Sequence, residues 1–323
     1  MPYCGREHQV AHRNEHKRAC NAIKKSKEKL DAEEVKLRNM PPDMFTPANL
    51  FEEQVGRFWG ILDTRDYMRA RYAYADALLK IESTLAVQAA FDNIRDLLRL
   101  CRGDNMGMRY VLPGIFLRLG RDQECYDFIK WWAIDRPDYD WSDMSLPYLD
   151  MKDEDVFGGV ALFTKEYSNL CFTVAITLIK IRLLLDLENL QNASILCAKM
   201  PQELLDGVRS QLVSDAIVHN PRKKDLMEGK NLTSLIKELK SQIDDLHTAV
   251  YESNPYFWPA MLDPQRHLTA EPQPYSAGSI PEMQIYLQYS YASWAETSGA
   301  IEIIEKLEEG TFFTDEELGE QGE

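Results

Sequence analysis

Four residues whose side chains commonly bind zinc lie within the first twenty positions of the chain. Cys4, His8, His16 and Cys20 follow the spacing C-x3-H-x7-H-x3-C. The members of each outer pair are four residues apart, so on a helix they lie one turn apart and on the same side. Structural zinc is bound by thiolate sulfur and imidazole nitrogen, and four such ligands complete its tetrahedral shell. These four residues are therefore the candidate metal site.

The same stretch resembles the second half of a MYND-type zinc finger of fungal type. The matching residues are Tyr3, Cys4, His8, Gln9, His16, Lys17 and Cys20. The family holds two zinc ions in a cross-braced arrangement, and the resemblance implies that Cys4 and His8 serve one ion while His16 and Cys20 serve the other. It also implies that the finger recognises peptides, often short motifs that contain proline. The two Cys-x-x-Cys pairs that precede these residues in the family do not occur in this sequence.

Several interpretations of this incomplete finger stay open. The start codon could lie inside a longer gene, the finger could be degenerate, or all four residues could form one composite site. The segment could also be a charged amphipathic helix in which Cys and His are incidental. A composite site requires residues 9–15 to bend back, and these lack the Gly or Pro that would mark a sharp turn. We therefore predict weak zinc binding, or none, by the chain as written.

Two consecutive helix pairs are predicted between Arg65 and Trp132. The first consists of residues 67–79 and 85–100, and the apolar residues of the second helix recur at helical spacing. Ala75 and Ala90 are small and are expected where the two helices cross. Helix pairs of this kind need neighbours to bury their apolar faces, which predicts a stacked arrangement.

The second pair resembles a divergent tetratricopeptide-type (TPR) repeat. Its matching residues are Leu119, Gly120, Asp122, Glu124 and Cys125, with Cys125 at the expected helix crossing. Pro113 departs from the family pattern and is expected to kink the first helix of this pair. Asp104 or Asn105 is predicted to cap the start of that helix. The fold class is therefore predicted as all-α, with TPR-like stacked helical hairpins forming an α-solenoid behind the partial MYND zinc-finger segment.

The remaining elements are also predicted to be helical. Residues 154–200 should form two helices, residues 232–251 a further helix, and residues 280–296 and 298–308 a last pair. The acidic stretch from Asp135 to Asp155 is interpreted as a surface loop. The basic stretch 21–39 is interpreted as a solvated linker helix rather than a nucleic-acid site, because acidic residues interleave it and no aromatic residue could stack on a base.

Composition and charge exclude several classes of protein. The chain has 323 residues, 45% of them hydrophobic, and a net charge of -15, which disfavours general affinity for nucleic acid or anionic membrane. The apolar run 170–187 contains Lys180 and Arg182, so we interpret it as a core helix and not as a membrane span. Four of the six cysteines lie in apolar helical stretches without paired spacing, and no secretory signal is present, which favours an intracellular protein, cytoplasmic or nuclear.

No catalytic motif is recognisable in the sequence. A phosphate-binding Gly-rich loop, a nucleophile elbow and an H-E-x-x-H pair are all missing. We predict a partial finger and linker over 1–40, a TPR-like helical domain over 41–312 and a disordered acidic tail over 313–323. The expected function is a non-enzymatic scaffold that binds protein or peptide partners, with no small-molecule substrate. The expected cofactor is zinc, unless the incomplete finger does not bind it. The alternative is a fragment or accessory of a MYND/SET-type lysine methyltransferase.

Overall fold

The computed structural model shows a helical protein. It describes residues 6–44, 46–166, 168–196, 206–207, 211, 213–229, 232–271 and 273–313, with the backbone alone for residues 6–16 and 194–196. Within these ranges there is no β-strand, and an isolated bridge joins Arg57 to Cys101. The prediction of an all-α fold is confirmed. The predicted acidic tail lies outside the described residues from position 314 onward.

The chain divides into two compact units. One comprises residues 1–112 together with 138–148, and the other comprises residues 113–137 together with 149–323. The predicted division at residues 40 and 312 stays a prediction, because it concerns a finger and a tail rather than these units. The two units are considered one at a time below.

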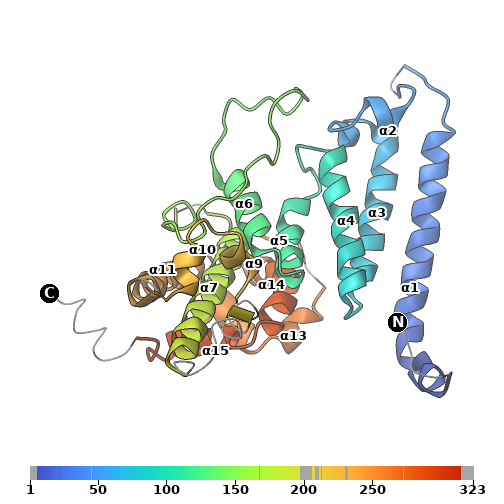
Figure 1. The fold of residues 1–323 in the computed structure, drawn as a ribbon. Helices are drawn as coiled ribbons and strands as arrows, with labels where there is room; N and C mark the ends of the chain where they lie inside the picture. The colour runs from blue at the N-terminus through green and yellow to red at the C-terminus, as the bar shows by residue number, and fades with distance from the viewer. Residues whose placement is uncertain are drawn as a thin grey trace. The chain divides into compact units, whose positions relative to one another are not determined.

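Three long helices lie side by side in the first unit (Figure 1). They are α1 (Arg6–Arg38), α3 (Arg65–Leu79) and α4 (Thr84–Leu100), and the short elements between α1 and α3 are α2 (Leu50–Glu53), η1 (Phe58–Gly60) and η2 (Leu62–Thr64). Helix α3 packs against α1 on one side and against α4 on the other. Ala75 and Ala90 are both completely buried, as expected for small residues between closely packed helices.

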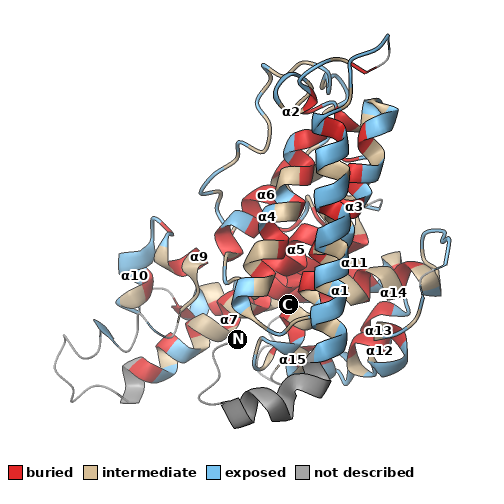
Figure 2. Ribbon diagram, turned by 90° about the vertical axis from the view of Figure 1, so that its right-hand side faces the viewer, coloured by how far each residue is buried: buried red, intermediate tan, exposed pale blue. Residues whose placement is uncertain are grey.

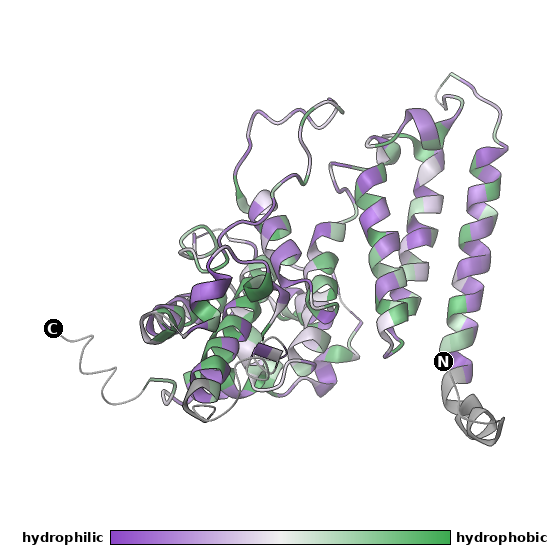
Figure 3. Cartoon of the chain, in the orientation of Figure 1, coloured by the Kyte–Doolittle hydropathy of each residue, from purple (hydrophilic) through white to green (hydrophobic). Residues whose placement is uncertain are grey.

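Helix α1 buries only one narrow side. Leu30 and Leu37, seven residues apart and so on one face, are buried, while most other described residues of the helix are exposed (Figure 2). Figure 3 shows the same helix as mostly hydrophilic. The predicted solvated helix is thus present with most of its described side chains exposed, although it packs along α3 and does not stand free as a linker.

The second unit is built around α7 (Leu170–Leu196), which packs against helices from four other parts of the unit. Apolar residues surround this helix on nearly all sides, and Figure 3 shows it as largely hydrophobic. Its neighbours are α6 (Asp122–Ala133), α11 (Leu232–Ser253), α14 (Ile280–Ala295) and α15 (Ala300–Glu308), and the shorter helices are α9 (Asp215–Val218), α10 (Lys223–Met227), α12 (Phe257–Leu262) and α13 (Gln265–Leu268).

One prediction about this region is corrected and one is confirmed. Residues 154–166 and 168–169 are irregular where the first of two helices was expected, and α7 is the one long helix described between α6 and residue 197. Several Gly, Asp and Ser residues in 153–168 favour turns over helix there. The predicted helix 170–187 does lie in the core, and no helix in the described ranges has the length and apolar character needed to cross a bilayer.

Helix α5 (Met108–Arg118) begins in the first unit and enters the second at Pro113. Its start is capped as predicted by Asp104, whose carboxylate accepts hydrogen bonds from the backbone N–H of Met108 at 2.7 Å and of Arg109 at 2.9 Å. A tight turn at Gly120, with φ of +67°, leads from α5 into α6. The completely buried Cys125 of α6 donates from Sγ to the carbonyl oxygen of Pro113 at 3.6 Å.

Candidate functional site

The predicted zinc ligands lie at the start of α1. Cys4 lies outside the described residues, and for His8 and His16 the structure describes the backbone alone. Cys20 is exposed and forms no disulfide. The backbone is helical without interruption from residue 6 to residue 38, so the predicted linker and three of the four candidate ligands share one helix.

This continuous helix does not fit one composite zinc site. His8 and His16 are eight residues apart, which places them about 12 Å apart along the helix axis. A bend in residues 9–15 would be needed to bring both pairs to one ion, and these residues are helical. His16 and Cys20 do occupy positions one turn apart, but two ligands leave half of a tetrahedral shell to water. Among the described side chains, no cluster of three or more potential metal ligands was found.

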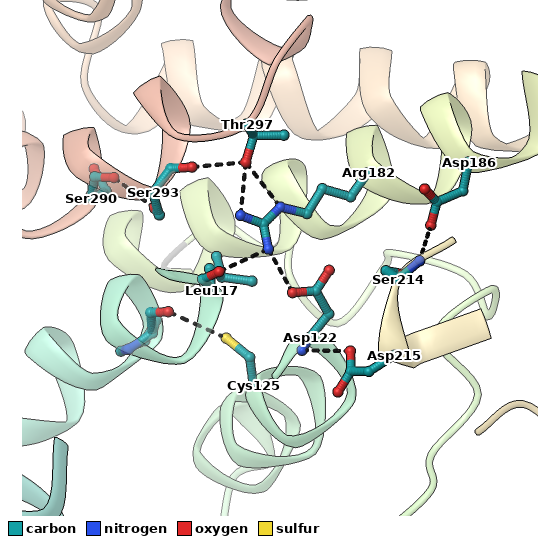
Figure 4. Close-up of polar contacts among 11 residues, drawn as sticks. Leu117, Asp122, Cys125, Arg182, Asp186, Ser214, Asp215, Ser290, Ser293 and Thr297 are labelled. Atoms are coloured by element: carbon teal, nitrogen blue, oxygen red, sulfur yellow. Dashed lines mark hydrogen bonds and ion pairs between the residues drawn. The ribbon is translucent and has the colours of Figure 1, made fainter. Parts of the chain in front are cut away.

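The second unit contains a buried charged centre that the motif search did not identify (Figure 4). Arg182 of α7 donates to Asp122 Oδ1 at 2.6 Å, to the carbonyl oxygen of Leu117 at 2.9 Å and to Thr297 Oγ1 at 2.7 and 3.0 Å. The Asp122 side chain is 2% exposed and that of Arg182 is 14% exposed. One guanidinium group thus connects the end of α5, the start of α6 and the turn between α14 and α15.

Two further carboxylates extend this centre. Asp215 accepts from the backbone N–H of Asp122 at 2.9 Å, and Asp186 accepts from the backbone N–H of Ser214 at 2.7 Å. Burial raises the pKa of Asp122 to about 6, although Arg182 acts to lower it, and burial raises the pKa of Asp186 to about 6. Asp215 and Asp186 thus accept hydrogen bonds from backbone N–H groups at the start of α6 and just before α9. Both carboxylates therefore have a structural role.

Lys180, two residues before Arg182 on α7, is completely buried. Its Nζ donates to the carbonyl oxygens of Val156 at 2.6 Å and Gly158 at 2.7 Å. Burial lowers the pKa of Lys180 to about 7, while Asp155 and Glu238 act to raise it. Lys180 therefore attaches the irregular segment after residue 149 to the central helix.

The buried thiols are not suited to nucleophilic chemistry. Cys125 and Cys171 are both buried and free of disulfides, as predicted. Burial raises the pKa of each thiol above its ordinary value. Because the thiolate is the nucleophile and the metal ligand, these residues behave as small apolar core residues.

Exposed apolar side chains lie around η1 and η2 in the first unit. Met44 is 90% exposed and Leu62 is 71% exposed, and Trp141 is also exposed. We call these three residues the apolar rim. Thr46 Oγ1 donates to Asp63 Oδ2 at 2.7 Å, which ties the turn that carries Met44 to the element that carries Leu62. Arg57 Nε donates to the carbonyl oxygen of Ser142 at 3.1 Å, which ties the segment that carries Trp141 to the start of η1.

The backbone beneath the rim is held by buried side chains. Phe58 and Thr64 are completely buried, and Thr64 Oγ1 donates to the carbonyl oxygen of Ile61 at 2.8 Å. The ring of Phe58 lies 5.2 Å from that of Phe51 and 6.2 Å from that of Tyr67, between ring centroids. The rim residues are thus presented on an anchored backbone, which lowers the conformational entropy that a binding partner would have to remove.

A positively charged and aromatic border adjoins the rim. The guanidinium carbons of Arg65 and Arg69 lie 5.1 and 5.4 Å from the ring centroid of Trp59, within the range of cation–π contacts. Tyr139 packs edge to face on Trp141 at 4.7 Å between centroids. Aromatic and Arg side chains around an apolar centre are typical of surfaces that bind other proteins. We therefore take the apolar rim as the candidate functional site.

Comparisons with known proteins gave no relative: no protein-family model, curated protein sequence or solved structure matches the chain.

One feature of the sequence does mark the buried centre. Lys180 and Arg182 stand inside an otherwise apolar run, and charged side chains in such a helix need buried partners. No comparable signal marks the apolar rim. Met44 and Trp141 are 97 residues apart in the sequence, and only the folded backbone brings the segments of the rim together.

Proposed function

We propose that the chain is a non-enzymatic interaction scaffold that binds a protein or peptide partner through the apolar rim. The finer features of the prediction belong to this proposal: TPR-like stacking of the helix pairs, and a MYND-related N-terminal segment beside them. In this account zinc is not required for partner binding, because the rim lies after the end of α1 and none of its residues is a predicted zinc ligand.

One observation carries the proposal: three large apolar side chains from separate segments are exposed around one anchored stretch of backbone. A fully exposed Met or Leu side chain gains about 1.5 to 3 kcal/mol when it is buried against a partner. Such side chains in a fixed arrangement can therefore bind a peptide that buries its own apolar residues against them.

The proposal is tested by selecting peptides from a displayed random library on the full-length protein and measuring their dissociation constants by fluorescence anisotropy. The double variant Met44→Ser/Leu62→Ser should weaken a rim-bound peptide by about 100-fold or more, since each side chain loses about 1.5 kcal/mol or more of apolar burial. Leu85→Ser is a matched control, because Leu85 is 82% exposed in the same unit but lies in the first turn of α4 and does not belong to the rim. Equal affinity of the double variant and the wild-type protein would contradict the proposal.

A further inference from the structure

Residues 17–29 of α1 carry a net positive charge, whereas the chain as a whole is acidic. Between residues 17 and 29 there are six Lys or Arg and a single Glu, whereas the whole chain has a net charge of -15. At physiological salt, charges are screened over about 8 Å. Charged groups farther away than this contribute little to the electrostatic potential at a given point on the protein surface. A local cluster of this kind therefore determines which ligands approach α1.

Three of these cations lie along one line of the helix surface. Arg18, Lys25 and Lys29 are separated by seven and four residues, the spacing that repeats on one face of an α-helix. All three are exposed, and no carboxylate among the described side chains forms an ion pair with them. We call them the basic ridge. Lys24 and Lys27, in contrast, pair with Glu28 and Asp31 of the same helix.

The ridge faces away from the packed side of α1. Leu30 and Leu37 mark the side that contacts α3, and the ridge positions lie about 80 to 140° around the helix from them at 100° per residue. Figure 2 shows this open side of α1 as mostly exposed. A ligand could therefore lie along the ridge without displacing α3.

We propose that the basic ridge of α1 is a docking site for an acidic α-helical segment of a partner protein. The three cations span about 16 Å along the helix at 1.5 Å per residue, which matches carboxylates placed with the same seven- and four-residue spacing on a second helix. This surface is separate from the apolar rim, so the inference does not depend on the proposed function of the rim.

Other polyanions fit the ridge less well. A single-stranded nucleic acid gains much of its affinity from bases that stack on aromatic rings, and residues 17–29 contain no aromatic residue. An amphipathic helix binds an anionic membrane by inserting its apolar side, and here that side is covered by α3.

The test uses a fluorescein-labelled helical peptide of about 18 residues, or five turns, with Glu at the ridge spacing. Its binding to the full-length protein is followed by anisotropy, beside a peptide of the same composition in scrambled order. The variant Arg18→Gln/Lys25→Gln/Lys29→Gln removes the ridge and retains good helix formers. The control Lys165→Gln/Lys223→Gln/Lys224→Gln removes the same charge from exposed lysines of the second unit.

We expect the ridge variant to bind the peptide about tenfold more weakly, as the loss of three exposed ion pairs implies. The control variant should stay within about twofold of the wild-type protein, and circular dichroism should show that both variants keep their helix content. The proposal is overturned if the wild-type protein does not bind the peptide at about 50 mM salt, where screening is weak. Equal losses in both variants, equal binding of the scrambled peptide, or tighter binding of oligothymidylate or phosphatidylserine vesicles would overturn it too.

Discussion

Gly114 of α5 lies directly against the backbone of Tyr289 in α14. A Cβ atom at position 114 would be 2.2 Å from the carbonyl oxygen of Tyr289, a distance that real Cβ atoms do not reach. The neighbouring atom is backbone, so it cannot rotate away as a side chain would. Glycine is therefore required here for the approach of two helices and not for a turn.

The first prediction is that Gly114→Ala destabilises the second unit. Overpacking costs typically about 1 to 3 kcal/mol, and the gain of up to about 1 kcal/mol from replacing a helical Gly offsets part of it. Urea unfolding measures the difference in the free energy of unfolding. Gly159→Ala is the control, since a Cβ there meets nothing within 4 Å. A Gly114→Ala protein as stable as the wild type would show that the two helices are not in contact at this point.

The second prediction concerns Arg182. Arg182→Met leaves the buried Asp122 without its cationic partner, and breaking a buried pair in this way typically costs about 3 to 5 kcal/mol. Lys224→Met makes a similar change at an exposed pair with Glu228, where the side chains are 87% and 44% exposed, and should change the free energy of unfolding by less than about 1 kcal/mol. Similar effects of the two substitutions would contradict the central position given to Arg182.

The third prediction is a pH dependence that arises from Lys180. Its pKa is lowered from 10.5 to about 7 in the folded protein, so between these values the unfolded chain binds one more proton than the folded chain. Stability therefore rises with pH across this window, by up to about 1.4 kcal/mol per pH unit. Below pH 7 both states are protonated and Lys180 contributes no slope.

Lys180→Met should remove this slope. The measurement is urea unfolding at pH 7, 8 and 9, and the expected result is a stability difference, wild type minus Lys180→Met, that grows as pH rises. The exposed Lys165 provides the control, because Lys165→Met should leave the difference constant. A stability difference between the wild type and Lys180→Met that does not change with pH would contradict the prediction. It would mean that the Lys180 ammonium group of the folded wild-type protein stays charged throughout this range.

The fourth prediction concerns zinc. Because the helix carries at most two candidate ligands within one turn, the purified protein should contain much less than one zinc per chain after dialysis against a metal-free buffer. Inductively coupled plasma mass spectrometry measures the metal content. The prediction is contradicted if one zinc is retained per chain and is lost in Cys20→Ala but not in Cys171→Ala. That result would mean that the N-terminal segment forms a complete zinc site.

Periodicity in the sequence was sufficient to predict most of the helices. The apolar spacing in 85–100 predicted α4 to within one residue at its start, and small residues at Ala75 and Ala90 correctly marked buried positions between helices. The same method failed for 154–169, because an apolar run with Phe and Val packs in the core equally well as irregular chain. A short run of apolar residues therefore does not by itself distinguish a helix from a loop that packs in the core.

Long-range contacts account for the features that could not be predicted. Arg182 donates hydrogen bonds to Leu117 and Thr297, which are 65 and 115 residues away in the sequence. No local sequence pattern specifies those partners. Gly114 gave no signal either, because a glycine inside a helix looks like an ordinary weak position until its neighbour is known. The Asp104 cap, in contrast, was predicted because it depends on residues only four and five positions away.

Binding at the apolar rim is tested most directly by the methyl resonances of methionine. The protein is labelled with carbon-13 at its methionine methyl groups and titrated with a library-selected peptide, and chemical shifts are followed by NMR. We predict that the signal of Met44, which is 90% exposed, shifts in a saturable way, while that of Met68, which is 1% exposed on α3, stays in place. Saturable binding that leaves the Met44 signal unchanged would contradict the assignment of the rim as the partner-binding surface.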